Sequence, residues 1–465
     1  MTHFPEDLRG KRAVVMGLGL FSGGVESARW LAARGARVVV TDLKDAAALA
    51  PSVKALEGTG VEFRLGAHDP ADFDAAAVVV ASPAVPMDHP LLRRAESRGA
   101  AVETEVCLFL RACPAPVTAV TGSNGKSTTA ALAGGMLRAA GRRVHLGGNI
   151  GRALVNEAAS MEAGDAVVLE ISSFQLEWTR RAGLHPAVGL VTNVTPNHLD
   201  RHGTFEAYLE AKAAVLPLPG EGRAAVLSHD DPGARSLAGS ARGRVVWTAL
   251  EGEPPGESVA WSGGRLLARL GGREEEVLRR EDVLLRGDFN LRNAASAAAA
   301  ALLAGAPAAA VREGCRSFRG LPHRIEPCGE AGGVLCVNDS KATTPEAAFR
   351  ALAAFEGRPL VAIAGGYDKK VDLAPLAKDL AARCAGVVLL GQTANLLEAL
   401  LRAEGFAAVA RAADMEEAVE RGLALAPPGG VLLLSPGHAS YGMFVNYEDR
   451  GDRFREAVRR RAAPR

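Results

Sequence analysis

The stretch VTAVTGSNGKSTTA, residues 117–130, carries the clearest chemical signal in the sequence. Gly125, Lys126 and Ser127 follow a short apolar run, as in loops whose backbone amides hold nucleotide phosphates before a helix begins. Lys126 would reach the outer phosphates, and the Ser127 hydroxyl would bind Mg²⁺. The usual pattern places a glycine at position 120, where this chain has Val120. We therefore predict a phosphate-binding loop of unusual form.

Two further polar residues follow apolar runs downstream of this loop. Glu170 ends the run VVLE, where carboxylates often meet metal-bound phosphates in nucleotide-hydrolysing folds. His198, in TNVTPNHLDRHG, follows the next strand-like run. Alone, such residues are more often a helix cap, a salt-bridge partner or an ordinary histidine. After a phosphate loop, metal binding is the favoured interpretation for Glu170.

Two other stretches have the composition of ligand-binding loops. In GLGLFSGG, Gly17 and Gly19 fit a dinucleotide fingerprint, but Ser22 stands where the third glycine belongs. Asp42 ends the next apolar run, where an acid binds ribose hydroxyls. This pattern favours a nucleotide or diphosphate ligand without implying NAD, and a purely structural turn is the alternative. The run NDSKATTP, residues 338–345, packs donors and acceptors after a third apolar run and favours ligand contact.

These motifs need elements to position them, and the apolar runs predict an α/β protein of three domains. Runs such as KRAVVMG, AVVLEIS and PLVAIAGG alternate with stretches of helical spacing, which indicates parallel sheets covered on both faces. We expect a Rossmann-like N-terminal domain over residues 1–104, a central P-loop ATPase-type parallel-sheet domain over 105–321, and a C-terminal Rossmann-like α/β domain over 322–465. Residues 251–279 are expected to form peripheral strands and turns, and the alanine-rich residues 294–310 a helix.

Composition narrows the class of protein. The 465 residues include 54 basic and 53 acidic side chains, so no field from net charge would attract nucleic acid or an anionic membrane. The six cysteines form no C-x-x-C pair and are expected to be buried thiols of a reducing compartment. The sequence shows neither a signal pattern nor a long uninterrupted apolar run, and a cytoplasmic protein is expected.

Seven motifs in order resemble the Mur ligase family, the ATP-dependent amide-forming enzymes of peptidoglycan synthesis. They are TGSNGKST, GGNIG, LEISSFQLE, NHLDRHG with YLEAK, LPHR, NDSKATTP and SPGHASYGMFVNYEDRG. The nearest resemblance is to the members that add D-glutamate to UDP-N-acetylmuramoyl-L-alanine through an acyl phosphate, and it covers nearly the whole chain. It implies ATP and two Mg²⁺ ions as cofactors, glutamate as a co-substrate, and a monomer with neither nucleic-acid nor membrane partners.

The resemblance also implies roles for individual residues. The ATP-binding residues would be Gly122, Ser123, Asn124, Gly125, Lys126, Ser127, Thr128, Asn290, Asn293, Arg324 and Asp339. The UDP-substrate residues would be Leu20, Phe21, Ser22, Asp42, Asn149, Ser172, Gln175 and His198. The glutamate-binding residues would be Thr343, Lys369, Ser440 and Tyr447. One Mg²⁺ would lie on Ser127 and Glu170 and the other on His198 and Lys212, whose amine is carbamylated in the family. Lys126, His198, Lys212 and Lys341 would be the residues at the reaction centre.

Some positions depart from the family pattern. Phe289 stands where a histidine is usual, and Ala84 where a glycine is usual near the uracil site. Gly442 and Val445 replace a usual acid and lysine near the amino-acid pocket. A related ligase that adds another amino acid, such as L-glutamate, is therefore an alternative. Three further hypotheses explain fewer of the motifs, namely a folate polyglutamate-type ligase, a non-catalytic nucleotide sensor and an NAD-dependent dehydrogenase.

Overall fold

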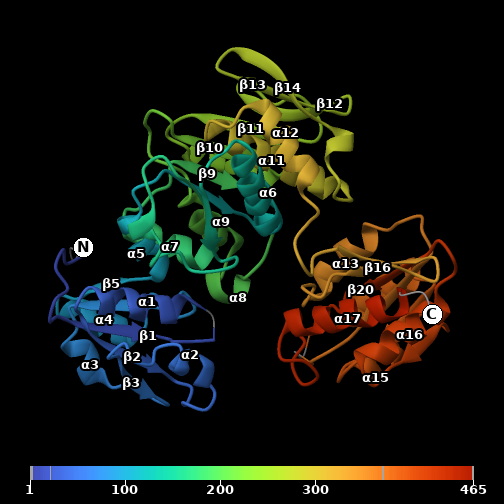
Figure 1. Cartoon of the computed structure of the whole chain (residues 1–465), viewed down its shortest axis with the longest axis horizontal. Helices are drawn as coiled ribbons and strands as arrows, with labels where there is room; N and C mark the ends of the chain where they lie inside the picture. The colour runs from blue at the N-terminus through green and yellow to red at the C-terminus, as the bar shows by residue number, and fades with distance from the viewer. Residues whose placement is uncertain (1–3, 21, 369–370, 463–465) are drawn as a thin grey trace. The chain divides into compact units, whose positions relative to one another are not determined.

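The chain forms two compact units in a computed structural model that describes residues 4–20, 22–368 and 371–462 (Figure 1). The first unit comprises Met1–Leu284 with Asp288–Phe318, and the second comprises Leu285–Gly287 with Arg319–Arg465. The predicted site residues Phe21 and Lys369, and the side chain of Ser22, lie outside the described part. Three β-sheets are present in this part, two in the first unit and one in the second.

The first sheet has five parallel strands in the order β3-β2-β1-β4-β5. Its strands are β1 (Arg12–Met16), β2 (Arg37–Asp42), β3 (Glu62–Leu65), β4 (Val78–Ala81) and β5 (Ala101–Glu103). Its helices are α1 (Ser22–Ala33), α2 (Ala50–Lys54), α3 (Pro70–Asp74), α4 (Pro90–Ser97) and α5 (Glu105–Ala112). Strand β1 pairs with β2 on one side and β4 on the other, so the strand order reverses there. Ligands of such sheets bind at the carboxyl ends of the strands beside this reversal.

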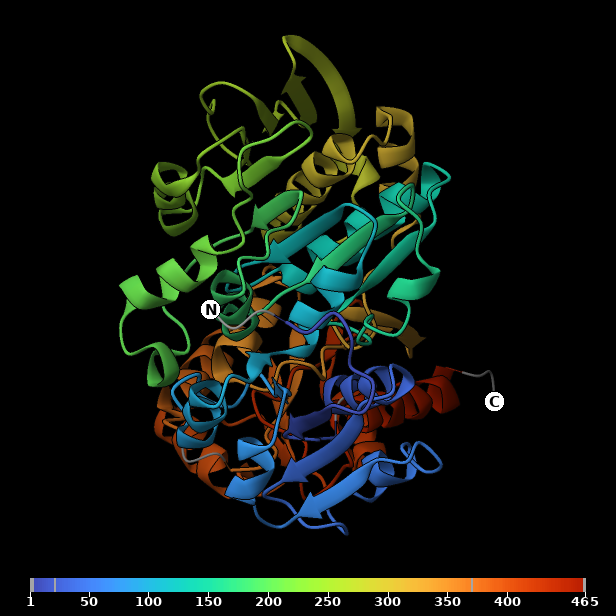
Figure 2. The same cartoon turned by 90° about the vertical axis from the view of Figure 1, so that its left-hand side faces the viewer.

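The second sheet has nine strands in the order β14-β13-β12-β11-β10-β9-β6-β8-β7. Its strands are β6 (Val117–Thr121), β7 (Val144–Gly148), β8 (Ala166–Glu170), β9 (Val188–Val191), β10 (Ala224–Ser228), β11 (Val245–Ala249), β12 (Ser258–Ser262), β13 (Arg265–Leu270) and β14 (Arg273–Arg279). The last two strands are antiparallel and form the edge at the top of Figure 2. This confirms the peripheral strands expected over residues 251–279.

The helices of this second sheet position the central loops. They are α6 (Lys126–Ala139), α7 (Ser173–Arg181), α8 (Leu199–His202), α9 (Phe205–Ala213), α10 (Pro232–Ser236), α11 (Asp288–Leu303) and α12 (Ala308–Ser317). Helices α6, α11 and α12 lie side by side (Figure 1). The helical structure expected over residues 294–310 is confirmed except for a turn, because α11 ends at Leu303 and α12 begins only after Pro307. Gly305, with φ +90°, makes the turn between them.

The second unit holds a six-stranded sheet in the order β15-β16-β20-β17-β18-β19. Its strands are β15 (Glu326–Ala331), β16 (Val334–Asn338), β17 (Leu360–Ala364), β18 (Gly386–Leu389), β19 (Val409–Arg411) and β20 (Val431–Leu434). Its helices are α13 (Pro345–Ala353), α14 (Ala374–Arg383), α15 (Ala394–Ala403), α16 (Met415–Leu425) and α17 (Tyr447–Ala462). Only the edge strand β15 is antiparallel to its neighbour.

Burial explains why the apolar runs become strands. In β4, β6, β17 and β20 every residue is buried, because helices cover both faces of each parallel sheet. The predicted α/β class is confirmed, while the predicted domain boundaries stay a prediction.

All six cysteines are free thiols, and Cys113 and Cys328 are only half-buried, which corrects the expectation that all would be buried. No helix within the described ranges has the length and apolar character needed to cross a lipid bilayer.

Candidate active site

The stretch after β6 forms a tight loop at the start of α6. Val120 is fully buried within β6 and pairs with Glu170 on one side and Leu190 on the other, so this position belongs to the sheet. The turn begins at Gly122, with φ +149°, and closes at Gly125, with φ +80°. A Cβ atom at Gly125 would lie 2.3 Å from Oδ1 of Asn293, so only glycine fits. The unusual form of the loop therefore arises because β6 continues through Val120 and ends at Thr121, so that the turn begins only at Gly122.

The loop is held from two directions. Lys126 Nζ donates to the carbonyl oxygens of Gly122 at 2.9 Å and Ser123 at 3.1 Å. Asn124 N donates to Oδ1 of Asn193 at 2.9 Å, just beyond β9. The Ser123 hydroxyl donates to Thr195 O at 2.9 Å. A loop tied in this way presents a preformed cradle of backbone amides at the N-terminus of α6.

Glu170 lies at the carboxyl end of β8, the strand next to β6. Its side chain is buried, and Oε1 accepts a hydrogen bond from Nδ2 of Asn149 at 2.9 Å. Within the described residues Oε2 is buried and accepts no hydrogen bond. A buried carboxylate oxygen without a partner is costly, so one that is kept beside a phosphate-type loop fits a cation ligand.

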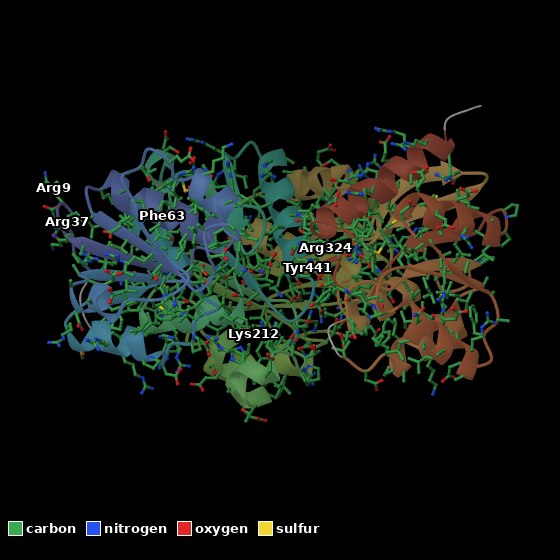
Figure 3. All side chains as sticks on the ribbon, turned by 90° about the horizontal axis from the view of Figure 1, so that it is seen from below. Arg9, Arg37, Phe63, Lys212, Arg324 and Tyr441 are labelled. Carbon is green, nitrogen blue, oxygen red and sulfur yellow. The ribbon has the colours of Figure 1, made fainter. Side chains whose placement is uncertain are left out.

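Lys212 is almost fully buried in the last turn of α9 (Figure 3). Its Nζ donates to Oγ1 of Thr121 at 3.4 Å and lies 4.6 Å from the centre of the Tyr208 ring. Burial, and then the positive charge of Lys126, hold the pKa of Lys212 well below its usual range. The structure thus places a readily deprotonated amine within electrostatic reach of the phosphate-type loop.

His198 is the residue before α8 and has a left-handed backbone, with φ +53°. The residue as a whole is exposed, but its ring lies 5.1 Å from the ring of Phe174. Burial of part of the ring, and then the charge of Lys126, lower the pKa of His198, which favours the neutral, metal-binding form of the imidazole. Left-handed backbone at a non-glycine residue is uncommon and often marks a functional position.

The two asparagines predicted for the adenine side lie in the first turns of α11. Asn293 Oδ1 accepts a hydrogen bond from Oγ1 of Thr129 at 3.4 Å, and its Nδ2 donates to Oδ1 of Asn290 at 3.1 Å. Both side chains are buried. The structure therefore brings Asn293 against the phosphate-type loop, with Asn290 beside it.

The predicted UDP-substrate residues fall into two groups. Asp42 is buried and accepts hydrogen bonds from the backbone N of Gly19 at 3.1 Å and of Lys44 at 2.9 Å, so it shapes the glycine turn itself. Leu20, in that turn, is 55% exposed, which leaves this apolar side chain open to a ligand. In the central sheet, Ser172 and Gln175 form a capping box at the start of α7. Some of the hydrogen bonds of these two side chains therefore stabilise the start of α7 and are not available to a ligand.

The predicted residues Ser127 and Thr128 lie in the first turn of α6, and Ser127 is buried. The other predicted residues within the described part belong to the second unit, and Figure 3 labels one of them, Arg324. Asp339 is buried after β16 and accepts hydrogen bonds from the Ser435 hydroxyl at 3.1 Å and from Ile325 N at 3.2 Å. Lys341 Nζ lies 5.0 Å from the centre of the Tyr447 ring. Ser440 lines a pocket of about 270 Å³, open space at its mouth included. Arg324 precedes β15, and Thr343 precedes α13.

Asp339 leads to a prediction about pH. Burial raises the pKa of Asp339 to about 7, above the value near 4 of an unfolded chain. The folded state then binds a proton that the unfolded state has lost, so this group lowers stability as pH rises from about 4 to about 7. We expect the melting temperature of the ligand-free protein to fall less between pH 5 and pH 8 in Asp339→Asn than in wild type. Equal slopes in scanning calorimetry would contradict the assignment.

Sequence reasoning missed residues that complete this site. Tyr208 is buried, its hydroxyl lies 3.1 Å from the Ser123 hydroxyl, and its ring lies under Lys212. Its position four residues before Lys212, one helical turn away, was an available signal. Thr192 Oγ1 donates to Asn124 O at 2.6 Å and Arg201 reaches a loop of the first sheet. Those pairings depend on the fold and had no local signal.

Family models match three consecutive segments of the chain. They are described as the MurD-like N-terminal domain of Mur ligases, over residues 11–104, the Mur ligase middle domain, over residues 120–301, and the Mur ligase glutamate ligase domain, over residues 323–438. The chain belongs to the Mur ligase family.

Similar curated proteins share one name. The UDP-N-acetylmuramoylalanine–D-glutamate ligase of Roseiflexus sp. (strain RS-1) is 42% identical over 97% of this chain and 99% of its own length. The ligase of the same name from Symbiobacterium thermophilum is 41% identical over 96% of this chain and 98% of its own length.

Solved structures share the fold at lower identity. The Thermotoga maritima UDP-N-acetylmuramate-alanine ligase MurC aligns with a TM-score of 0.58 at 20% identity, over 97% of this chain and 99% of that chain. The MurF ligase from the same organism, in complex with ADP, aligns with a TM-score of 0.57 at 19% identity, over 98% of this chain and 100% of that chain.

Proposed function

We propose that this chain joins D-glutamate to UDP-N-acetylmuramoyl-L-alanine at the expense of ATP, as a step in the synthesis of peptidoglycan precursors. The names of the relatives that align over nearly its full length support this choice of substrates. The observation that carries the chemistry is the gathering of Lys126, the unpartnered oxygen of Glu170 and the buried amine of Lys212 around one loop. We further propose that the enzyme works as a cytoplasmic monomer.

The reaction needs activation because a carboxylate is a poor electrophile. The terminal carboxylate of the muramoyl-alanine substrate attacks the γ-phosphorus of ATP, so a carbon-bound oxygen bonds to phosphorus and ADP leaves. The amine of D-glutamate then attacks the carbonyl carbon of this acyl phosphate, inorganic phosphate leaves, and the amine loses a proton. Lys126, with its ammonium at the loop, stabilises charge that develops on the transferring group, and the loop amides hold the phosphates in line.

The residues present fit the two Mg²⁺ ions that the family implies. Glu170, with its unpartnered Oε2, and Ser127 would hold one ion, and His198 with Lys212 the other. Bound there, Mg²⁺ supplies positive charge to the phosphate oxygens. No group of three or more His, Cys, Asp or Glu side chains is arranged to hold a metal in residues 4–20, 22–368 and 371–462. Further oxygen ligands would therefore come from phosphates, water and a modified lysine, as suits Mg²⁺.

Lys212 would need a carbamate to act as such a ligand, since an ammonium repels a cation. Its lowered pKa favours the neutral amine that can attack CO₂, forming an N–C bond and releasing one proton. We expect protein equilibrated with ¹³C-bicarbonate to show one protected carbamate signal by ¹³C NMR, and ligase activity to fall on CO₂ removal and return with bicarbonate. Lys212→Met should lack both the signal and the bicarbonate response. An equal signal in Lys212→Met would place the carbamate elsewhere.

One assay tests the substrates. The protein is incubated with ATP, Mg²⁺ and UDP-N-acetylmuramoyl-L-alanine, and a panel of D- and L-amino acids is offered. We expect phosphate release and a product of the mass of one added glutamate with D-glutamate alone. Val445 stands near Ser440 in the sequence, is 79% exposed and replaces the lysine that is usual in the family. The comparison of D-glutamate with L-glutamate therefore matters most in this assay. Phosphate release independent of any amino acid would contradict the proposed function.

A further inference from the structure

Helix α8 is a single turn that follows His198, and a helix this short has no stability of its own. Its position therefore depends on side chains that anchor it. His202 is one anchor, since its Nε2 lies 3.0 Å from the Ser173 hydroxyl and its Nδ1 lies 3.4 Å from a carboxylate oxygen of Glu177. Both partners belong to α7, within the same sheet domain.

Arg201 is the second anchor, and it reaches the other sheet of the first unit. Its two terminal nitrogens donate to the carbonyl oxygens of Ala84 at 2.9 Å and Val85 at 3.2 Å. The guanidinium also lies 5.2 Å from the centre of the Phe174 ring, against which the His198 ring packs. A charged donor that serves two adjacent carbonyl groups fixes both distance and orientation.

The acceptor loop borders the glycine turn of the first sheet. Ser82 follows β4 and donates its backbone N to Met16 O at 2.8 Å, at the end of β1. A Cβ atom at Gly17 would lie 2.8 Å from Cβ of Ser82, so the loop and the glycine turn touch. This is the strand reversal at which a nucleotide ligand of such a sheet binds.

We propose that Arg201 is a positioning residue that couples the loop at Ser82–Val85, beside the glycine turn of the first sheet, to the turn that presents His198. The inference rests on the proposed function, because it takes the UDP end of the substrate to lie at the first sheet. Arg201 holds α8 at a set place against that loop, so the left-handed His198 faces the reaction centre only while the loop keeps its place. The position of the loop beside the bound UDP group thereby sets the position of His198, at the other end of the substrate.

Arg201→Met tests this coupling, because methionine keeps an unbranched apolar side chain and removes the guanidinium donors. We expect the KM for UDP-N-acetylmuramoyl-L-alanine to rise about tenfold and kcat to fall about tenfold, with the KM for ATP within about twofold of wild type. Arg201→Lys keeps a charge and one donor direction and should recover part of both changes. If Arg201→Met does not fold, Arg201→Lys carries the same comparison with a smaller change.

A binding measurement without turnover separates positioning from general damage. Calorimetric titration with UDP-N-acetylmuramoyl-L-alanine in the absence of ATP should show about tenfold weaker binding to Arg201→Met. Arg180→Met is the matched control, since Arg180 pairs with Glu210 at the surface of the same region and should leave every value unchanged.

Unchanged substrate affinity in Arg201→Met would overturn the coupling, even if kcat fell. An equal rise in the KM for ATP would overturn it too, since that indicates general disturbance. Absence of ligation by the wild-type protein would instead reject the proposed function, and this inference with it.

Discussion

Lys126→Ala is expected to abolish ATP-dependent amide formation and leave the protein folded. Lys126 brings its ammonium to the loop at Gly122 and Ser123, where the outer phosphates of ATP would lie. Loss of one such charge in phosphoryl transfer lowers kcat/KM by about a thousandfold or more, about 4 kcal/mol of transition-state stabilisation. Product mass and phosphate release measure the loss.

The fold should survive this change because Lys126 is itself only half-buried and the loop keeps its other hydrogen bonds, from Asn124 N to Asn193 and from the Ser123 hydroxyl to Thr195 O. We expect the melting temperature of Lys126→Ala to stay within about 4 °C of wild type. Lys378→Ala, an exposed lysine of α14 in the second unit, is the control and should keep full activity. Substantial turnover by Lys126→Ala would reject the assignment of the loop.

Glu170→Gln is expected to lower activity and raise stability together. The amide keeps the acceptor for Asn149 and removes the charge of a buried carboxylate that has one unpartnered oxygen. Relief of that desolvation is worth about 1–3 kcal/mol in the ligand-free protein. Loss of the anionic oxygen should lower kcat by about a hundredfold or more and raise the Mg²⁺ concentration needed for half-maximal rate.

The two halves of this prediction are measured separately. Denaturant unfolding of the ligand-free protein measures the change in the free energy of unfolding. A titration of the ligase rate with Mg²⁺ measures kcat and the Mg²⁺ concentration needed for half-maximal rate. Glu210→Gln, at an exposed carboxylate of α9, is the control for both. A less stable but fully active Glu170→Gln would show that Glu170 serves the fold and binds no metal.

The strands that could be predicted from the sequence are those in which several consecutive residues are buried and therefore apolar. Strands β6, β8 and β17 are apolar because helices cover both faces of their sheets, and that pattern is visible without the structure. Strands β15 and β19, at the two edges of the third sheet, were not predicted, because β15 is largely polar and β19 has only three residues.

In the candidate site, too, the residues that could be predicted are those that stand in a local sequence motif. Lys126, Glu170 and Lys212 could be proposed because each stands in a local motif. The bond from Arg201 to Ala84 joins residues 117 positions apart, and no local pattern encodes it. The capping bonds of Ser172 and Gln175 show the converse, since a motif that resembles a substrate site also has a local structural use.

The segment Leu285–Gly287 belongs to the second unit although the chain on both sides of it belongs to the first. The Arg286 guanidinium lies 5.8 Å from the centre of the Phe355 ring, and a Cβ atom at Gly320 would lie 3.4 Å from the Leu285 side chain. A chimaera that exchanges the carboxy-terminal part with that of a relative at residue 319 alone would break these contacts. Recombination among these ligases should therefore tolerate joint exchange of both segments better than a single crossover.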